Sequence, residues 1–204
     1  MSIILSLGRT VQAYLRQYGE HGPGVVVHCG RCGCGMQRHG RYWRWVVMPR
    51  RMYHMPVYRR RCPQCKGTCS LLPDFLRPYA RFVTLVREGV LRRRLRGRWS
   101  WGALAEKASS FTVGLLSEKT LRRWLAGARQ VAGAWGQFLA QYILQGWPAT
   151  DVFSLTRRRD GVDAALHFLL EVGDWYRRQV VVQAGQHPGL FAALNHLVGA
   201  PPPL

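Results

Sequence analysis

The chain has 204 residues, enough for one to three small folded units, and 48% of them are hydrophobic, which excludes a disordered protein. The formal net charge is +20, and the whole excess lies in residues 1–130, because residues 131–204 carry equal numbers of acidic and basic side chains. This asymmetry favours a polyanionic partner for the first two thirds over a diffuse basic surface with no partner.

The first quarter of the chain predicts one helix and one hairpin. The apolar spacing of residues 2–19 is typical of an amphipathic helix. Residues 42–47 alternate between apolar and polar types, and residues 55–61 can pair with them as the second arm of a hairpin. Residues 48–54 would form the connection.

The next part of the chain predicts three helices in succession. A helical pattern begins at Pro78 and ends at Gly97. Ser100 can cap a second, shorter helix, and Ser117 can cap a third that runs to about Ala128.

The last third predicts further helices, at residues 135–143, at residues 161–183 and from Pro188 to Gly199. We therefore expect an α+β fold: a small β zinc ribbon, a mainly α helix-turn-helix region and a C-terminal helical unit. The expected divisions are an N-terminal helix (1–24), the ribbon (25–77), the helix-turn-helix region (78–130) and a C-terminal helical interaction unit (131–204).

Two CxxC pairs lie in the predicted ribbon, Cys29–Cys32 and Cys62–Cys65, separated by 29 residues. Two residues between cysteines allow a tight turn to place both thiolates on one tetrahedral ion, and two such turns complete a structural Zn²⁺ site. The separation is wider than in the commonest spacing, and the intervening hairpin accounts for it. The alternatives are a group of buried free thiols and a redox pair.

Four further side chains near these pairs are metal ligands by type, namely Cys34, Cys69, His28 and His39. Either cysteine lies close enough in sequence to replace a ligand. Because four thiolates already complete a tetrahedron, we expect all four residues to lie outside the site.

The third predicted helix has one basic face. On a helical wheel, Lys119, Arg122, Arg123 and Arg129 lie opposite an apolar face. Arginine forks can reach guanine edges in a major groove, so this face is a candidate reader of DNA. The alternative is an ordinary solvated charged face.

A run of arginines precedes the second predicted helix and consists of Arg92, Arg93, Arg94, Arg96 and Arg98. Such a cluster is strongly self-repelling unless a polyanion neutralises it, which favours contact with phosphates. The alternative is a solvated helix end.

Several of these motifs together resemble the zinc-ribbon and helix-turn-helix front end of bacterial insertion-sequence transposases. They are Cys29-Gly-Arg-Cys32-Gly33, His39-Gly-Arg-Tyr-Trp-Arg44, Arg61-Cys62-Pro-Gln-Cys65 and Leu72-Pro-Asp-Phe-Leu-Arg-Pro-Tyr79, together with the Ser117-Glu-Lys-Thr-Leu-Arg-Arg-Trp124 segment. The chain is most similar to an uncharacterised family of short bacterial proteins that carry this front end without a transposase catalytic domain. The resemblance covers roughly residues 25–130 and departs from the pattern at Gly30, where such knuckles usually carry Pro.

No catalytic constellation is visible: the acids after residue 130 fall within 24 residues in a helical context, and no P-loop or HExxH motif occurs. We expect no enzyme but a zinc-dependent protein that binds double-stranded DNA, either an accessory or regulatory factor of a mobile element or a stand-alone transcriptional regulator. The alternatives are the DNA-binding subunit or relic of a split transposase and an RNA-binding zinc-ribbon protein.

The remaining expectations concern partners and location. Residues 131–204 would mediate homodimerisation or bind a transposase or recombinase. No apolar stretch reaches the ~20 residues that a bilayer requires, so we expect no membrane contact and a cytoplasmic, nucleoid-associated protein.

Overall fold

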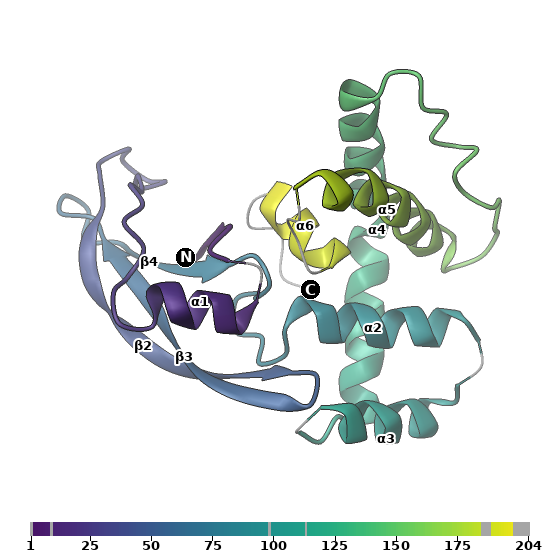
Figure 1. The fold of residues 1–204 in the computed structure, drawn as a ribbon, viewed down its shortest axis with the longest axis horizontal. Helices are drawn as coiled ribbons and strands as arrows, with labels where there is room; N and C mark the ends of the chain where they lie inside the picture. Colours follow the sequence, from purple (N-terminus) through teal and green to yellow (C-terminus); the bar gives the residue numbers. More distant parts are fainter. Residues whose placement is uncertain (1, 9, 98, 113, 185–188, 198–204) are drawn as a thin grey trace.

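The structure is a computed structural model that describes residues 2–8, 10–97, 99–112, 114–184 and 189–197 (Figure 1). It is an α+β fold, as expected, with a four-stranded sheet beside a group of helices. Over the described residues the elements are β1 (Ser2–Leu5), α1 (Val11–Tyr18), β2 (Gln37–Met48), β3 (Arg51–Arg61), β4 (Thr68–Pro73), α2 (Thr84–Leu95), α3 (Trp101–Phe111), α4 (Glu118–Gly146), α5 (Ala164–Ala184) and α6 (Leu190–Leu197).

The sheet has the strand order β1-β4-β3-β2, and its longest part is the antiparallel hairpin of β2 and β3. The predicted hairpin is confirmed, but its connection is shorter than expected. Met48 pairs with Arg51, so only Pro49 and Arg50 form the turn, and Arg50 adopts a left-handed backbone (φ 61°) to close it. The tip of the hairpin packs against α3, where the Arg50 N–H donates a hydrogen bond to the Phe111 carbonyl over 2.7 Å.

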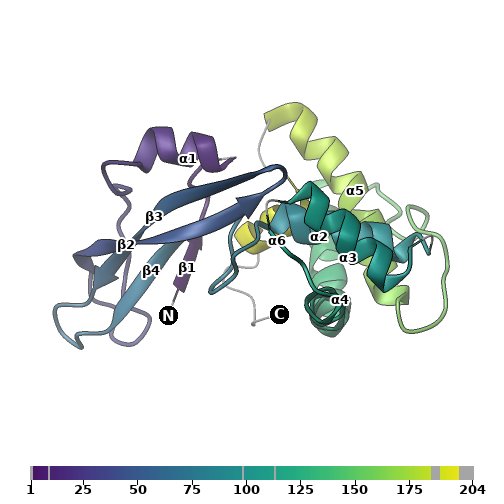
Figure 2. The same cartoon turned by 90° about the horizontal axis from the view of Figure 1, so that it is seen from below.

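The single helix predicted for residues 2–19 is wrong. Ser2–Leu5 instead forms β1, which pairs in parallel with β4 from Ser70 to Pro73. Gly8, at φ 105°, turns the chain, and the Thr10 side chain accepts a hydrogen bond from the Ala13 N–H to cap α1. The apolar residues of this segment therefore serve two elements, and α1 lies against one face of the sheet (Figure 2).

Two of the predicted helix caps are confirmed. Ser100 accepts from the Ala103 N–H at the start of α3, and Ser117 accepts from the Thr120 N–H at the start of α4. The helix expected from Pro78 begins later, at Thr84. The segment before it is held in a loop, where the Val47 N–H of β2 donates to the Arg81 carbonyl.

The end predicted for the third helix, near Ala128, is wrong because α4 continues without a break for 29 residues. The expected boundary between residues 130 and 131 therefore falls inside a helix. Gly136 does not interrupt α4; it provides room for α5, since a Cβ there would lie 2.9 Å from Cδ1 of Phe168. Tertiary packing thus extends a helix that local sequence would end.

The last two helices complete the structure. α5 corresponds to the helix expected at residues 161–183, and α6 to the helix expected from Pro188 to Gly199. Pro188 and Gly199 themselves lie outside the described part of the chain. One hydrophobic cluster joins α1, the hairpin and α2 through α6, and it includes Val11, Leu121, Leu169 and Leu194. Segments assigned to the N-terminal, ribbon, helix-turn-helix and C-terminal divisions therefore share one core.

Candidate metal centre and nucleic-acid interface

The hairpin brings the two CxxC pairs together. Cys29 and Cys32 precede β2, Cys62 and Cys65 follow β3, and the antiparallel register pairs Gln37 with Arg61 at the open end of the hairpin. The Sγ atoms of Cys29 and Cys65 are 3.4 Å apart, as are those of Cys32 and Cys62. All four sulfur atoms lie within 4.8 Å of one another.

The two turns have the same construction. The first cysteine of each donates its N–H over 2.8 Å to a carbonyl five residues later, Cys29 to Cys34 and Cys62 to Gly67. In each turn the residue after the second cysteine is left-handed, with φ 71° at Gly33 and 58° at Lys66. This backbone returns the chain and leaves both thiols of a pair on the same side.

Backbone hydrogen bonds favour the thiolate form of two of these cysteines. The N–H groups of Arg31 and Cys32 lower the pKa of Cys29 to about 6, and the N–H of Cys65 lowers the pKa of Cys62. Thiolates are the form of cysteine that binds metals. Four of them around one Zn²⁺ ion, each at about 2.3 Å, would lie about 3.8 Å apart, so the cluster fits a tetrahedral ion after small shifts.

The remaining candidate ligands lie outside this cluster. Cys34 donates to Oε1 of Gln64 over 2.6 Å, and Cys69 is buried with its sulfur 3.6 Å from that of Met36. His28 and His39 are exposed. Within the described ranges, the four CxxC cysteines form the one group of His, Cys, Asp or Glu side chains close enough to hold a metal ion.

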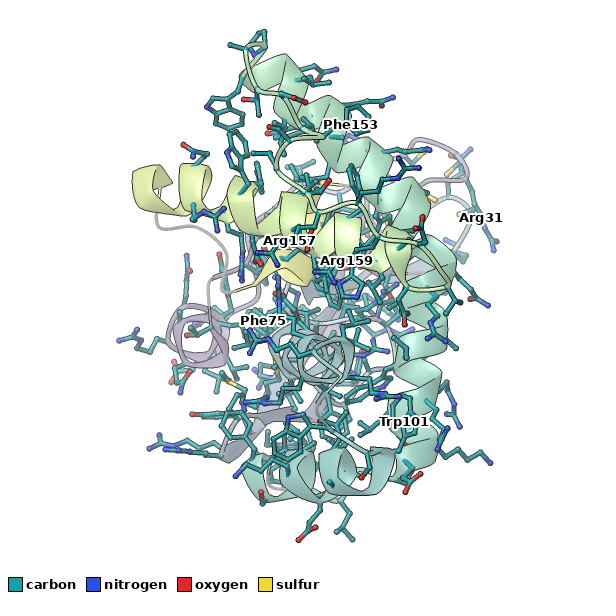
Figure 3. All side chains as sticks on the ribbon, turned by 90° about the vertical axis from the view of Figure 1, so that its right-hand side faces the viewer. Arg31, Phe75, Trp101, Phe153, Arg157 and Arg159 are labelled. Atoms are coloured by element: carbon teal, nitrogen blue, oxygen red, sulfur yellow. The ribbon has the colours of Figure 1, made fainter. Side chains whose placement is uncertain are left out.

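The basic face predicted on the third helix is divided in the structure. Lys119, Arg122 and Arg123 are exposed at the start of α4. Arg122 lies over the ring of Trp101, 4.7 Å from its centre, and pairs with Glu118 at 3.3 Å. Figure 3 labels Trp101 on α3. Arg129 lies two turns further on, where it forms an ion pair with Asp163 at 2.7 Å.

The predicted arginine run lies at the end of α2, and Arg92 is partly buried there. It pairs with Glu88 and with Asp174 of α5, each at 2.8 Å. Carboxylates already neutralise two of the predicted DNA contacts, since Arg92 pairs with Glu88 and Asp174 and Arg129 pairs with Asp163.

The other members of the run have no single role. Arg93 lies over the Phe111 ring and Arg94 over the Trp101 ring, at 5.6 and 4.7 Å. Arg96 is exposed, and Arg98 lies outside the described residues. Arg93 and Arg94 thus form cation–π contacts, and Arg94 also donates a hydrogen bond to the Trp99 carbonyl over 3.1 Å.

The outer face of the hairpin carries an aromatic cluster that the sequence interpretation did not assign to the site. His54 lies between Trp43 and Trp45, with ring centres 5.0 and 4.7 Å away, and Arg41 lies 5.3 Å from the centre of the Trp43 ring. The two tryptophans are 46% and 52% exposed. The alternation of Trp43 and Trp45 with Arg44 in the sequence indicates that the two tryptophans share one face of a strand. That His54 lies beside them could not be predicted, because it depends on the register between β2 and β3.

The fold and the cysteine cluster define a class: an α+β protein with four cysteines gathered closely enough to hold a metal ion. Residues 29–124 match a family described as Domain of unknown function (DUF6431), so the match runs from the first cysteine of the cluster into α4. No curated protein and no solved structure matches the chain. Among the described helices, none is both long and apolar enough to cross a membrane.

Proposed function

We propose that this chain is a zinc-dependent DNA-binding protein without a catalytic centre of its own, an accessory or regulatory factor of a mobile element or a stand-alone transcriptional regulator. Cys29, Cys32, Cys62 and Cys65 would hold one Zn²⁺ ion, and the exposed start of α4 would contact double-stranded DNA. The resemblance to the front end of insertion-sequence transposases supports the link with mobile DNA.

The observation that carries the proposal is the convergence of four thiols from two identical turns. When bound, Zn²⁺ would cross-link the two arms of the hairpin at its open end. Four protein ligands leave no open coordination position for a substrate, which is the arrangement of structural rather than catalytic zinc sites. The metal would therefore stabilise the sheet that packs against the helices.

The helices support the DNA-binding part of the proposal. α2, α3 and α4 contact one another, and the start of α4 presents Lys119, Arg122 and Arg123 to solvent. Six residues separate α3 from α4, and Ser117 caps the second of these helices. An exposed, capped and basic helix start supported by a preceding helix has the layout of a helix-turn-helix reader.

One observation favours a second candidate, binding of single-stranded RNA. The exposed Trp43, His54 and Trp45 rings form a platform beside Arg41. Bases of single-stranded nucleic acids stack on such rings, whereas the bases of a duplex are not free to do so.

The two candidates are separated by a competition experiment with the zinc-loaded protein. Genomic duplex fragments bound by the protein are recovered and sequenced, and a recovered duplex is then competed with single-stranded RNA of the same length. We expect enrichment of particular duplexes, which a Lys119→Ala/Arg122→Ala variant loses and a Trp43→Ala variant retains. Equal recovery of all duplexes, together with stronger competition by RNA, would refute the proposal in favour of the second candidate.

A further inference from the structure

A pocket of about 440 Å³ lies between the loop that joins β4 to α2 and the first turns of α4. Arg77 and Arg81 line it from the loop, Arg87 from α2, and Arg123 from α4. The Arg44 guanidinium donates a hydrogen bond to the Ala80 carbonyl and holds the loop to the sheet. The pocket is thus formed by three separate elements, each of which contributes an arginine.

No carboxylate lines this pocket. A larger pocket of about 950 Å³ between α2 and α5 also contains arginines, but Glu171 and Asp174 line it as well and pair with Arg159 and Arg92. Two carboxylates in the wall of the larger pocket therefore offset part of its positive charge, whereas no acid lines the smaller pocket.

Arg87 is the most informative side chain in this pocket. It is 8% exposed, and its guanidinium lies 5.1 Å from the centre of the Trp124 ring. Within the described part of the chain, no carboxylate lies within ion-pair distance of it. Burial lowers the pKa of Arg87 to about 10, and burial followed by repulsion from Arg87 lowers that of Arg77 to about 10. A buried cation in the position of Arg87 is costly unless a ligand supplies the opposite charge.

We propose that the pocket lined by Arg77, Arg81, Arg87 and Arg123 binds one phosphate group. An arginine fork matches the geometry of phosphate oxygens, and Arg123 stands at the pocket beside Lys119 on the exposed start of α4. In the DNA-binding function proposed above, on which this assignment of the source rests, the phosphate is a backbone phosphodiester. The pocket would then fix the position of α4 against the duplex, and Arg123 would position DNA rather than read its bases.

The test uses Arg87→Met and Arg123→Gln in the full-length, metal-loaded protein, with Arg158→Met as the matched control. Arg158 is exposed on the segment between α4 and α5, away from the pocket, and its substitution removes the same charge. Each variant is examined by thermal unfolding in inorganic phosphate or in chloride at equal ionic strength. Each is also titrated with duplex DNA over a range of salt concentrations.

We expect phosphate to raise the melting temperature of the wild type and of the control above the chloride value, but not that of Arg87→Met. In chloride, Arg87→Met should melt at a higher temperature than the wild type, because it removes an uncompensated buried cation. The affinity of both pocket variants for DNA should fall about tenfold, and the salt slope should flatten by about 0.9 for each phosphate contact removed.

The outcomes separate this proposal from the proposed function. If the wild type binds DNA and both pocket variants match it in affinity and salt slope, with no effect of phosphate on melting, the phosphate pocket is refuted and the DNA-binding function stands. A phosphate effect that Arg87→Met abolishes, in a protein that does not bind DNA, supports the pocket, assigns it to a free phosphate and refutes the proposed function. If DNA affinity falls in Arg87→Met and Arg123→Gln but not in the Arg158→Met control, the bound phosphate group is assigned to the DNA backbone.

Discussion

Arg129 and Asp163 form a two-point ion pair, with Nε 2.7 Å from Oδ1 and Nη2 3.0 Å from Oδ2. Arg129 belongs to α4, and Asp163 immediately precedes α5, so the pair joins the middle of one helix to the start of the other. In sequence, Arg129 belongs to a basic helical face. In the structure, its fork is occupied by a carboxylate from the C-terminal third.

The first prediction concerns DNA affinity. Arg122→Gln should weaken binding to a preferred duplex by about 1–3 kcal/mol, because Arg122 is exposed at the start of α4. Arg129→Gln should change the affinity by less than about 0.5 kcal/mol, because its donors are held by Asp163. Titration of labelled duplex with both variants measures the difference. Equal losses would show that Arg129 leaves Asp163 to contact DNA.

The second prediction concerns stability and pH. The hydrogen bond from Arg129 lowers the pKa of Asp163 below its unfolded value of about 3.9. The pair therefore stabilises the fold fully above that value, and its contribution is lost as the pH falls through the lower folded pKa. At neutral pH, Asp163→Asn should reduce the free energy of unfolding by about 1 kcal/mol, since both side chains are about one-third exposed.

Urea unfolding of the wild type and of Asp163→Asn at neutral pH and near pH ~3 checks this, since ~3 lies below the unfolded pKa. The difference between the two proteins should shrink at the lower pH. Asp160→Asn, at an exposed position on the preceding segment, serves as the matched control for the removal of one carboxylate. A difference that grows as the pH falls would mean that the sign of the linkage is wrong.

The third prediction concerns the metal. Purified protein should contain one Zn²⁺ per chain, and Cys62→Ser should abolish tight binding, because the ion would lose one of four thiolates. Structural zinc sites contribute an apparent ~10–16 kcal/mol in small peptides, so the sheet should lose near-ultraviolet dichroism in this variant. Metal analysis and dichroism measure both effects. Cys34→Ser is the matched control and should retain the metal; zinc loss in both variants would assign Cys34 to the site.

The fourth prediction tests whether the C-terminal third shares the core. Leu194 of α6 is fully buried in the cluster that reaches α1 and α2, so Leu194→Ala should reduce the free energy of unfolding by about 2–5 kcal/mol. Leu115→Ala, at a 96% exposed position, should cost less than about 0.5 kcal/mol. Denaturant titration monitored through the tryptophans gives both values. A separate early transition that leaves the rest of the protein unaffected would show that the C-terminal third folds as its own unit.

The fifth prediction concerns the aromatic cluster. If single-stranded RNA stacks on the hairpin, Trp45→Ala should weaken its binding by about 1–3 kcal/mol. Phe153→Ala removes another exposed aromatic ring, 81% exposed and remote from the hairpin, and should have no effect. RNA titration followed by tryptophan fluorescence compares them. Identical affinities for wild type and Trp45→Ala would remove the hairpin face from consideration as a stacking surface.

The sequence by itself determined the features that depend on neighbours along the chain. The two CxxC turns, the hairpin between them and the caps Ser100 and Ser117 all involve short-range contacts, so local residue types suffice to predict them. The clustering of the four thiols follows because an antiparallel hairpin returns the chain to its starting point.

Only the tertiary structure decided the features that depend on distant partners. Ser2–Leu5 became a strand because β4, more than 60 residues later, offers a free edge, and α4 continued past residue 130 because α5 packs along it. The same applies to the charges. Arg129 and Arg92 form ion pairs with carboxylates of the C-terminal third, while Arg87 is buried without a carboxylate partner among the described residues. Helical periodicity predicts the face on which a side chain lies, but its electrostatic partner comes from another part of the fold.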